Sequence, residues 1–155
     1  MVEAGLRVER PRVAAARVSE LVTAIAESMA GQGGLNKAAT EVGPQPCDGV
    51  EVVRAVSVAD GGGEEPWYVD YSPYVMMYIG YVDLPSGTAP APLMGVVHDR
   101  LVARGWRSLR ADPEVVIESP YAGYGARLVA VAEPPGPRIG VYVSSPCFRC
   151  PEGGS

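Results

Sequence analysis

The stretch that decides the fold is WYVDYSPYVMMYIGYV, residues 67–82. It is rich in Val, Ile and Tyr, the residue types that favour strands over helices. The segment is long for one strand, and Pro73 cannot donate a backbone hydrogen bond within a sheet. We therefore predict an internal strand from Trp67 to Val82 that bends near Pro73.

Successive side chains of a strand point to opposite faces of the sheet, so this segment divides into two sets. The more aliphatic set, which we expect to meet helices, comprises Trp67, Val69, Tyr71, Val75, Met77, Ile79 and Tyr81. The other set comprises Tyr68, Tyr74, Met76 and Tyr78. Two helices cannot cover both sides of a sheet, so we expect this second set to be at least partly open and to be a candidate binding surface. The alternative is a central strand whose two faces are both covered.

The rest of the chain supplies two helices and further strands. Apolar residues at helical spacing predict helices over 13–29 and 93–104. Residues 31–49 are rich in Gly, Pro and polar residues, which indicates a long loop. Val-rich or alternating runs predict strands over the ranges 50–58, 106–118, 127–132 and 138–144.

This order of elements, with short Gly/Pro connections, favours antiparallel neighbours, because parallel strands need long crossovers. We predict an α+β fold in which an antiparallel sheet of about five strands carries both helices on one face. The predicted order is α-β-β-α-β-β-β. Residues 12–148 would form this single domain, between a flexible lead-in at 1–11 and a flexible tail at 149–155.

The end of the second helix has a specific signal. Arg100 and Arg104 lie near its C-terminus, where a positive charge complements the helix dipole. Gly105 follows directly and suits the left-handed residue that ends many helices. We expect Gly105 to have a positive φ and Trp106 to pack back on the last turn.

Composition excludes several classes of partner. The net charge is −5, Lys37 is the single lysine, and the arginines are scattered. Binding to nucleic acid or to anionic lipid needs a concentrated basic face, so we expect neither.

The sequence contains no run of eighteen apolar residues, so no segment is expected to span a membrane. The first predicted helix carries Arg17, Glu20 and Glu27, which a secretory signal does not tolerate. The chain is therefore expected to be cytoplasmic, or a mature form whose leader has been removed.

The three cysteines favour a disulfide over a redox-active site. Cys47 precedes the first predicted strand and Cys147 follows the last, so a bridge between them would close a loop of roughly 100 residues. The alternative is three thiols in a reducing cytosol. Cys150 completes a C-x-x-C motif, but Pro151 prevents the helix that such redox motifs open. Cys150 would then be unpaired or would pair between chains.

Other catalytic and metal chemistry lacks the residues it needs. His98 is the only histidine, which limits acid–base schemes and leaves a zinc site dependent on all three cysteines. No G-x-S-x-G motif is present. We expect no catalytic residue, cofactor or metal site, and we interpret His98 as a surface residue.

Short motifs at the ends of the elements carry a resemblance. They are a Pro-Cys pair before the first strand, R-G-W at Arg104–Trp106, and S-S-P-C at Ser144–Cys147. Together with the N-terminal helix, over residues 13–148, the chain resembles small envelope lipoproteins and secreted proteins of high-GC Gram-positive bacteria. The resemblance implies that Cys47 and Cys147 are the bridging pair and that the domain lies outside the cytoplasm. Most members of that group have no assigned activity.

The leading hypothesis is therefore a non-catalytic extracytoplasmic domain, secreted or envelope-anchored, that binds a protein or small ligand through an aromatic sheet face. The second hypothesis is a cytoplasmic accessory or interaction protein with free thiols. The third is an enzyme of unknown class. Sequence alone names no ligand and no oligomeric state.

Overall fold

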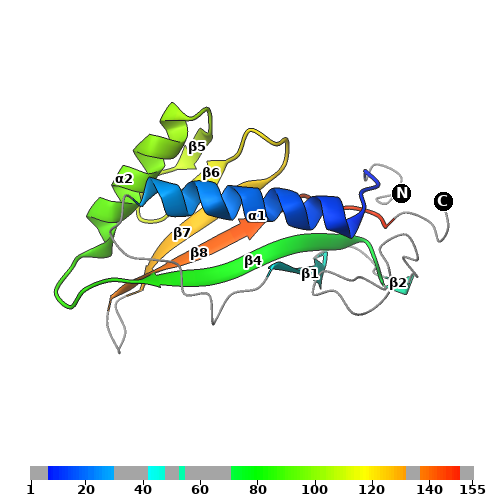
Figure 1. Cartoon of the computed structure of the whole chain (residues 1–155), viewed down its shortest axis with the longest axis horizontal. Coiled ribbons are helices and arrows are strands. Elements are labelled where there is room, and N and C mark those ends of the chain that lie inside the picture. The colour runs from blue at the N-terminus through cyan, green and yellow to red at the C-terminus, as the bar shows by residue number, and fades with distance from the viewer. Residues whose placement is uncertain (1–6, 30–41, 48–52, 55–70, 132–136, 151–155) are drawn as a thin grey trace.

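A computed structural model describes residues 7–29, 42–47, 53–54, 71–131 and 137–150. It is an α+β fold with two helices and a six-stranded antiparallel sheet (Figure 1). The helices are α1 (Pro11–Ser28) and α2 (Pro90–Ala103). The strands of the large sheet are β1 (Val42–Pro46), β4 (Tyr74–Asp83), β5 (Arg107–Arg110), β6 (Val115–Glu118), β7 (Gly125–Val131) and β8 (Arg138–Ser144). A separate two-stranded sheet pairs β2 (Val53–Arg54) with β3 (Tyr71–Ser72).

The large sheet has the order β1-β4-β8-β7-β6-β5, so β4 and β8 are neighbours in its interior. Each pair of neighbouring strands is antiparallel. Helix α1 lies along β4, and α2 packs beside α1 over the half formed by β5, β6 and β7 (Figure 1). Both helices cover the same face, which confirms the predicted two-layer arrangement.

Helix α1 forms because its apolar residues recur on one side. Pro11 occupies its first turn, where a missing N–H costs nothing. Val18, Leu21 and Ile25 are buried at helical spacing against the sheet. The predicted helix over 13–29 is confirmed, with its start two residues earlier.

Helix α2 ends as the sequence predicts. Gly105 has φ +97°, and its N–H donates to Val102 O at 3.0 Å. The N–H of Trp106 donates to Leu101 O at 3.0 Å. These two bonds form a Schellman motif, which satisfies carbonyls that the helix leaves open. Trp106 is 5% exposed, so the ring packs in the core as expected.

The large sheet has six strands, one more than predicted, and the small sheet adds two. The predicted strand at 106–118 is a hairpin of β5 and β6, with a register shift between Ser108 and Arg110. The predicted loop at 31–49 contains β1, which pairs with β4 although it holds Pro44 and Pro46. Proline is tolerated there because an edge strand has one side without a neighbouring strand. Within the predicted strand 50–58, only Val53–Arg54 is described as a strand, and it belongs to the small sheet.

The orientation predicted for the long strand is wrong. Tyr74, Met76 and Tyr78 are 0%, 0% and 5% exposed and face the helices. Their partners across the sheet are equally buried, since Tyr78 pairs with Val143 and Val143 is 0% exposed. The candidate surface at these residues is therefore core, and the set with Ile79 points away from the helices.

The described ends of the chain meet. Val8 forms a parallel bridge with Arg149, and the N–H of Arg149 donates to Arg7 O at 2.8 Å. Residues 7–9 and Arg149, predicted to be flexible, thus pair with each other in the described part of the chain.

Candidate functional site

The face of the large sheet opposite the helices carries apolar side chains, and we call it the open face. Neither helix covers it in the part of the chain that the structure describes. Strand register places the following outward-pointing apolar side chains on it: Val75, Met77, Ile79, Tyr81, Val116, Val129 and Tyr142. Ile79 is 47% exposed, while the others are partly buried by their neighbours. An antiparallel sheet that faces water on one side normally has polar residues there, so these apolar side chains resemble a covered surface, although charged side chains share the face.

A shallow groove of about 380 Å³ crosses the open face from Met77 to Leu109. Tyr142 is part of its lining, and the ring of this tyrosine lies down on the sheet beside Gly140. A Cβ at position 140 would come within 3.3 Å of the ring, so glycine leaves the space that the ring occupies. The guanidinium of Arg127 lies 5.6 Å from the centre of the same ring. The result is a flat aromatic area in the middle of the open face.

Charged groups on the open face neutralise one another. The ion pairs are Arg107–Glu118 (3.2 Å), Arg110–Glu114 (3.6 Å), Arg127–Glu114 (3.0 Å) and Arg138–Asp83 (3.7 Å). Four arginines and three carboxylates give these groups a net charge of +1, although the whole chain carries −5. Such a face does not select a highly charged ligand.

The sequence-predicted surface residues lie elsewhere. Tyr74 donates its hydroxyl to Glu9 O at 2.6 Å, and its ring lies 6.0 Å from that of Phe148. Tyr68 lies outside the described residues. The signal that would have given the correct orientation is Asp83, which shares its face with Tyr81 and Ile79. A charge that ends one alternating set marks that set as the one facing water.

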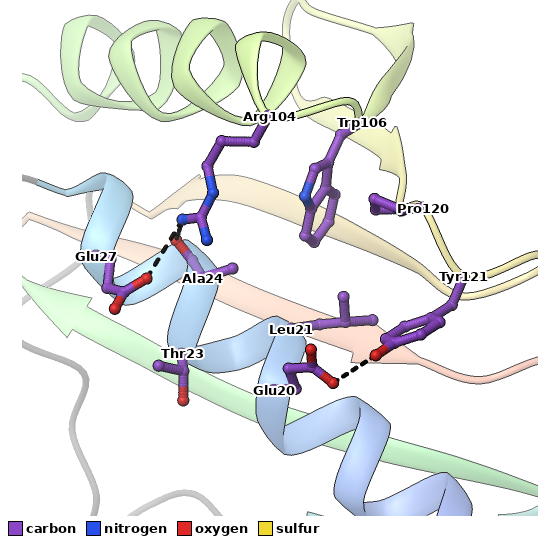
Figure 2. Close-up of a pocket in the computed structure, with 9 residues that line it drawn as sticks. All are labelled: Glu20, Leu21, Thr23, Ala24, Glu27, Arg104, Trp106, Pro120 and Tyr121. Atoms are coloured by element: carbon purple, nitrogen blue, oxygen red, sulfur yellow. Dashed lines mark hydrogen bonds and ion pairs between the residues drawn. The ribbon is translucent and has the colours of Figure 1, made fainter.

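A second groove, of about 470 Å³, lies between α1, the end of α2 and the β6–β7 turn (Figure 2). Leu21, Ala24 and Trp106 form its apolar lining, and polar side chains form its rim. These polar groups pair with each other: Tyr121 donates to Glu20 at 2.6 Å, and Arg104 lies 3.3 Å from Glu27 (Figure 2). The bond to Glu20 holds the proton on Tyr121 and raises the pKa of its hydroxyl. Among the residues that line this groove, the polar groups of the rim bond to each other and do not point to a space for a ligand.

One cluster has the order of a catalytic triad. His98 Nε2 lies 2.8 Å from Ser108 Oγ, and His98 Nδ1 lies 3.0 Å from Asp99 Oδ1. However, the Asp99 side chain is 83% exposed, so water competes with His98 for its carboxylate. Ser108 lines neither groove, and acyl transfer needs a bound substrate beside the nucleophile. The geometry fits a surface hydrogen-bond chain between α2 and β5.

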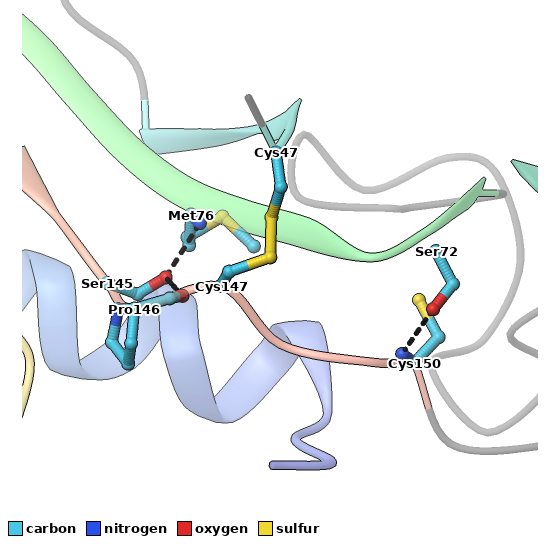
Figure 3. Close-up of a disulfide and its surroundings, with 7 residues drawn as sticks. All are labelled: Cys47, Ser72, Met76, Ser145, Pro146, Cys147 and Cys150. Atoms are coloured by element: carbon cyan, nitrogen blue, oxygen red, sulfur yellow. Dashed lines mark hydrogen bonds between the residues drawn. A yellow bond between two sulfur atoms is a disulfide. The ribbon is translucent and has the colours of Figure 1, made fainter. Parts of the chain in front are cut away.

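The predicted disulfide is present. Cys47 and Cys147 are joined, with Cα atoms 6.0 Å apart and a sequence separation of 100 (Figure 3). Ser145 positions this end of β8, because its Oγ accepts from Met76 N–H and donates to Pro146 O (Figure 3). The S-S-P-C motif thus guides the chain from β8 to the bridge. Cys150 stands outside the disulfide, is buried, and donates its N–H to Ser72 Oγ at 3.1 Å.

Metal and membrane features are missing from the described ranges. No group of three or more His, Cys, Asp or Glu side chains there has the arrangement to hold a metal ion. Neither α1 nor α2 is long and apolar enough to cross a membrane. No protein-family model, curated protein or solved structure matches this chain.

Proposed function

We propose that this chain is a non-catalytic extracytoplasmic binding domain that recognises a protein partner through the open face. The observation that carries the proposal is the apolar row Val75, Met77 and Ile79 on the side of β4 that no described helix covers. Leaving such a row in water is unfavourable, at roughly 25 cal/mol per Å² of apolar surface, so a partner that covers it gains this energy.

The form of the sheet favours a partner that packs on its face rather than one that adds a strand to its edge. At one edge, β1 contains Pro44 and Pro46, which remove backbone donors. At the other edge, β5 is short, bulged and flanked by Arg107 and Arg110. Both are common ways of blocking strand addition. The face is the remaining apolar surface of the sheet.

The extracytoplasmic location is supported by the Cys47–Cys147 bridge, since disulfides persist mainly in oxidising compartments. The resemblance to envelope lipoproteins supports the same location. A cytoplasmic accessory protein with three thiols is the competing function. Acid quenching of intact cells, followed by alkylation and mass measurement, should show Cys47 and Cys147 protected from alkylation until reductant is added. Alkylation of both without reductant would favour the cytoplasmic alternative.

Binding through the open face is tested by photocrosslinking in host cells. A benzophenone side chain placed at position 79 or 142 should give the same adduct, because Ile79 and Tyr142 are register partners on adjacent strands. The matched control is position 102, since Val102 is 41% exposed but lies on α2. Equal adducts from all three positions, or none from 79 and 142, would contradict a binding role for the open face.

A further inference from the structure

We infer that the occupant of the open face is a second copy of this chain, which packs sheet against sheet around a two-fold axis between β4 and β8. The inference rests on the proposed function, because it names the partner for the same surface. It follows from the register of β4 and β8 and from the placement of charge, and the size of the overlap sets the expected strength.

The register gives a self-complementary contact. Ile79 and Tyr142 are direct partners across β4 and β8. A two-fold axis that runs parallel to the strands and between these two residues places β4 of one copy over β8 of the other. The protruding Ile79 then meets the flat Tyr142 ring, which lies down beside Gly140. Each contact occurs twice, as an isologous interface requires.

The same axis brings opposite charges together. Asp83 is the register partner of Arg138, so Asp83 of each copy lies opposite Arg138 of the other. The Asp83 side chain is 61% exposed and its distance to Arg138 within one chain is 3.7 Å, so it can approach a second arginine. The ion pairs that involve Arg107, Arg110 and Glu118 lie on β5 and β6, beyond the overlap. Arg127 on β7 lies beside Tyr142 at the edge of the overlap, where it pairs with Glu114. The contact therefore has an apolar centre and a charged rim, which is the common form of protein interfaces.

The size of the overlap predicts the strength of the dimer. Strands β4 and β8 overlap along seven register positions, from Met77 to Asp83. Strand β1 lies beside Tyr74–Tyr78, so it overlaps β7 of the other copy at only two positions. With strands about 4.8 Å apart and residues about 3.3 Å apart, the flat overlap is on the order of 300 Å². Both faces together then bury roughly 600 Å², less than the ~1,000 Å² of a stable specific interface. We expect a weak, transient dimer with a dissociation constant on the order of 0.1–1 mM.

Sedimentation velocity from about 10 μM to about 1 mM tests the apolar centre. The wild-type chain should sediment at twice the monomer mass of 16.3 kDa as its concentration rises. Ile79→Glu should remain monomeric, while Val102→Glu, a change of similar exposure on α2, should dimerise normally. Thermal unfolding of both variants checks that they are folded. A wild-type chain that stays monomeric at about 1 mM overturns the inference.

A charge exchange between chains tests the axis itself. Asp83→Arg places two like-charged contacts in the homodimer, and so does Arg138→Asp. Each variant alone should dimerise about tenfold more weakly. A mixture of the two should form heterodimers close to wild-type strength. In the heterodimer, the arginine introduced at position 83 of one chain meets the aspartate introduced at position 138 of the other, and the native residues at these positions also meet with opposite charge.

The pair within each chain stays broken in both variants, so recovery in the mixture reports only contact between chains. No recovery in the mixture overturns this axis.

These outcomes separate the inference from the proposed function. A crosslinked adduct at position 79 with twice the chain mass supports both. An adduct of another mass, with a monomeric wild-type chain, keeps the binding function and overturns the second copy as occupant. Absence of any adduct at positions 79 and 142, with a monomeric chain, overturns both.

Discussion

Tyr124 combines a polar group with complete burial. Its side chain is 1% exposed, and its ring packs against the rings of Tyr121 and Phe148. Its hydroxyl has no hydrogen-bond partner among the described residues. Burial raises the pKa of this hydroxyl, and the nearby Arg17 guanidinium opposes the rise in part. The folded state therefore favours the neutral phenol at Tyr124.

Replacing Tyr124 with Phe should change stability differently at neutral and at alkaline pH. At pH 7, Tyr124→Phe should leave the free energy of unfolding unchanged or raise it by up to about 1 kcal/mol, because an unpaired buried hydroxyl is removed. Because the pKa of Tyr124 is raised in the folded state, the folded protein keeps this proton to a higher pH than the unfolded chain does. The contribution of the neutral phenol to the free energy of unfolding is therefore complete below the unfolded pKa of 10.0 and is lost as pH rises through the folded pKa. Urea unfolding between pH 8 and 11 should show a shallower alkaline loss in the variant. A loss above about 1 kcal/mol at pH 7 would mean that the hydroxyl has a partner.

At the scale of a single element, helix α2 contains one glycine and ends at another, and the two differ in backbone conformation alone. Gly105 ends the helix with φ +97°, whereas Gly95 lies inside it. A Cβ at either position would meet nothing within 4 Å. Packing is therefore equal at the two sites, and any difference between them comes from the chain itself.

Alanine at these two sites should have opposite effects. Gly95→Ala should raise the free energy of unfolding by about 0.5–1 kcal/mol, because alanine loses less conformational freedom in a helix. Gly105→Ala should lower it by about 1–2 kcal/mol, because a Cβ disfavours the left-handed region. Chemical denaturation with the disulfide intact measures both. If the two variants shift the midpoint in the same direction, the helix does not end at Gly105 in solution.

At the scale of the whole molecule, the disulfide joins the edge of the sheet to the end of the chain. Cys47 follows edge strand β1, and Cys147 follows the central strand β8. The bridge spans 100 positions, so it removes a large part of the freedom of the unfolded chain. The chain-entropy model gives about 4–5 kcal/mol for this closure, a large share of the roughly 5–15 kcal/mol typical of whole domains.

The double variant Cys47→Ser, Cys147→Ser should therefore lose about 4 kcal/mol of unfolding free energy. The wild-type chain in reductant should give the same denaturation midpoint, since reductant opens the same bridge and leaves Cys150 as it is. A midpoint in reductant equal to that of the oxidised protein would show that the bridge adds no stability. The comparison needs no assumption about location in the cell.

Local sequence determined the features whose signals lie within a few residues. Helical spacing located α1 and α2, and Gly105 with Trp106 located the end of α2. Alternation and short connections predicted an antiparallel sheet with both helices on one face. These features depend on backbone propensity and periodicity, which neighbouring residues carry by themselves.

Tertiary structure decided which face of β4 is open, because in the sequence only Asp83, at the end of the strand, marks that face. Both sets of side chains on this strand are apolar, so hydrophobicity does not separate Tyr78 from Ile79, and register with the buried Val143 fixes the choice. β1 likewise contains two prolines, which disfavour a strand, and it is a strand because it pairs with β4. The disulfide was expected from its position in the sequence, but its partners meet because the sheet order brings β1 and β8 to the two sides of β4. The periodicity of a strand is visible in its own sequence, whereas its pairing and its buried side depend on residues distant in the chain.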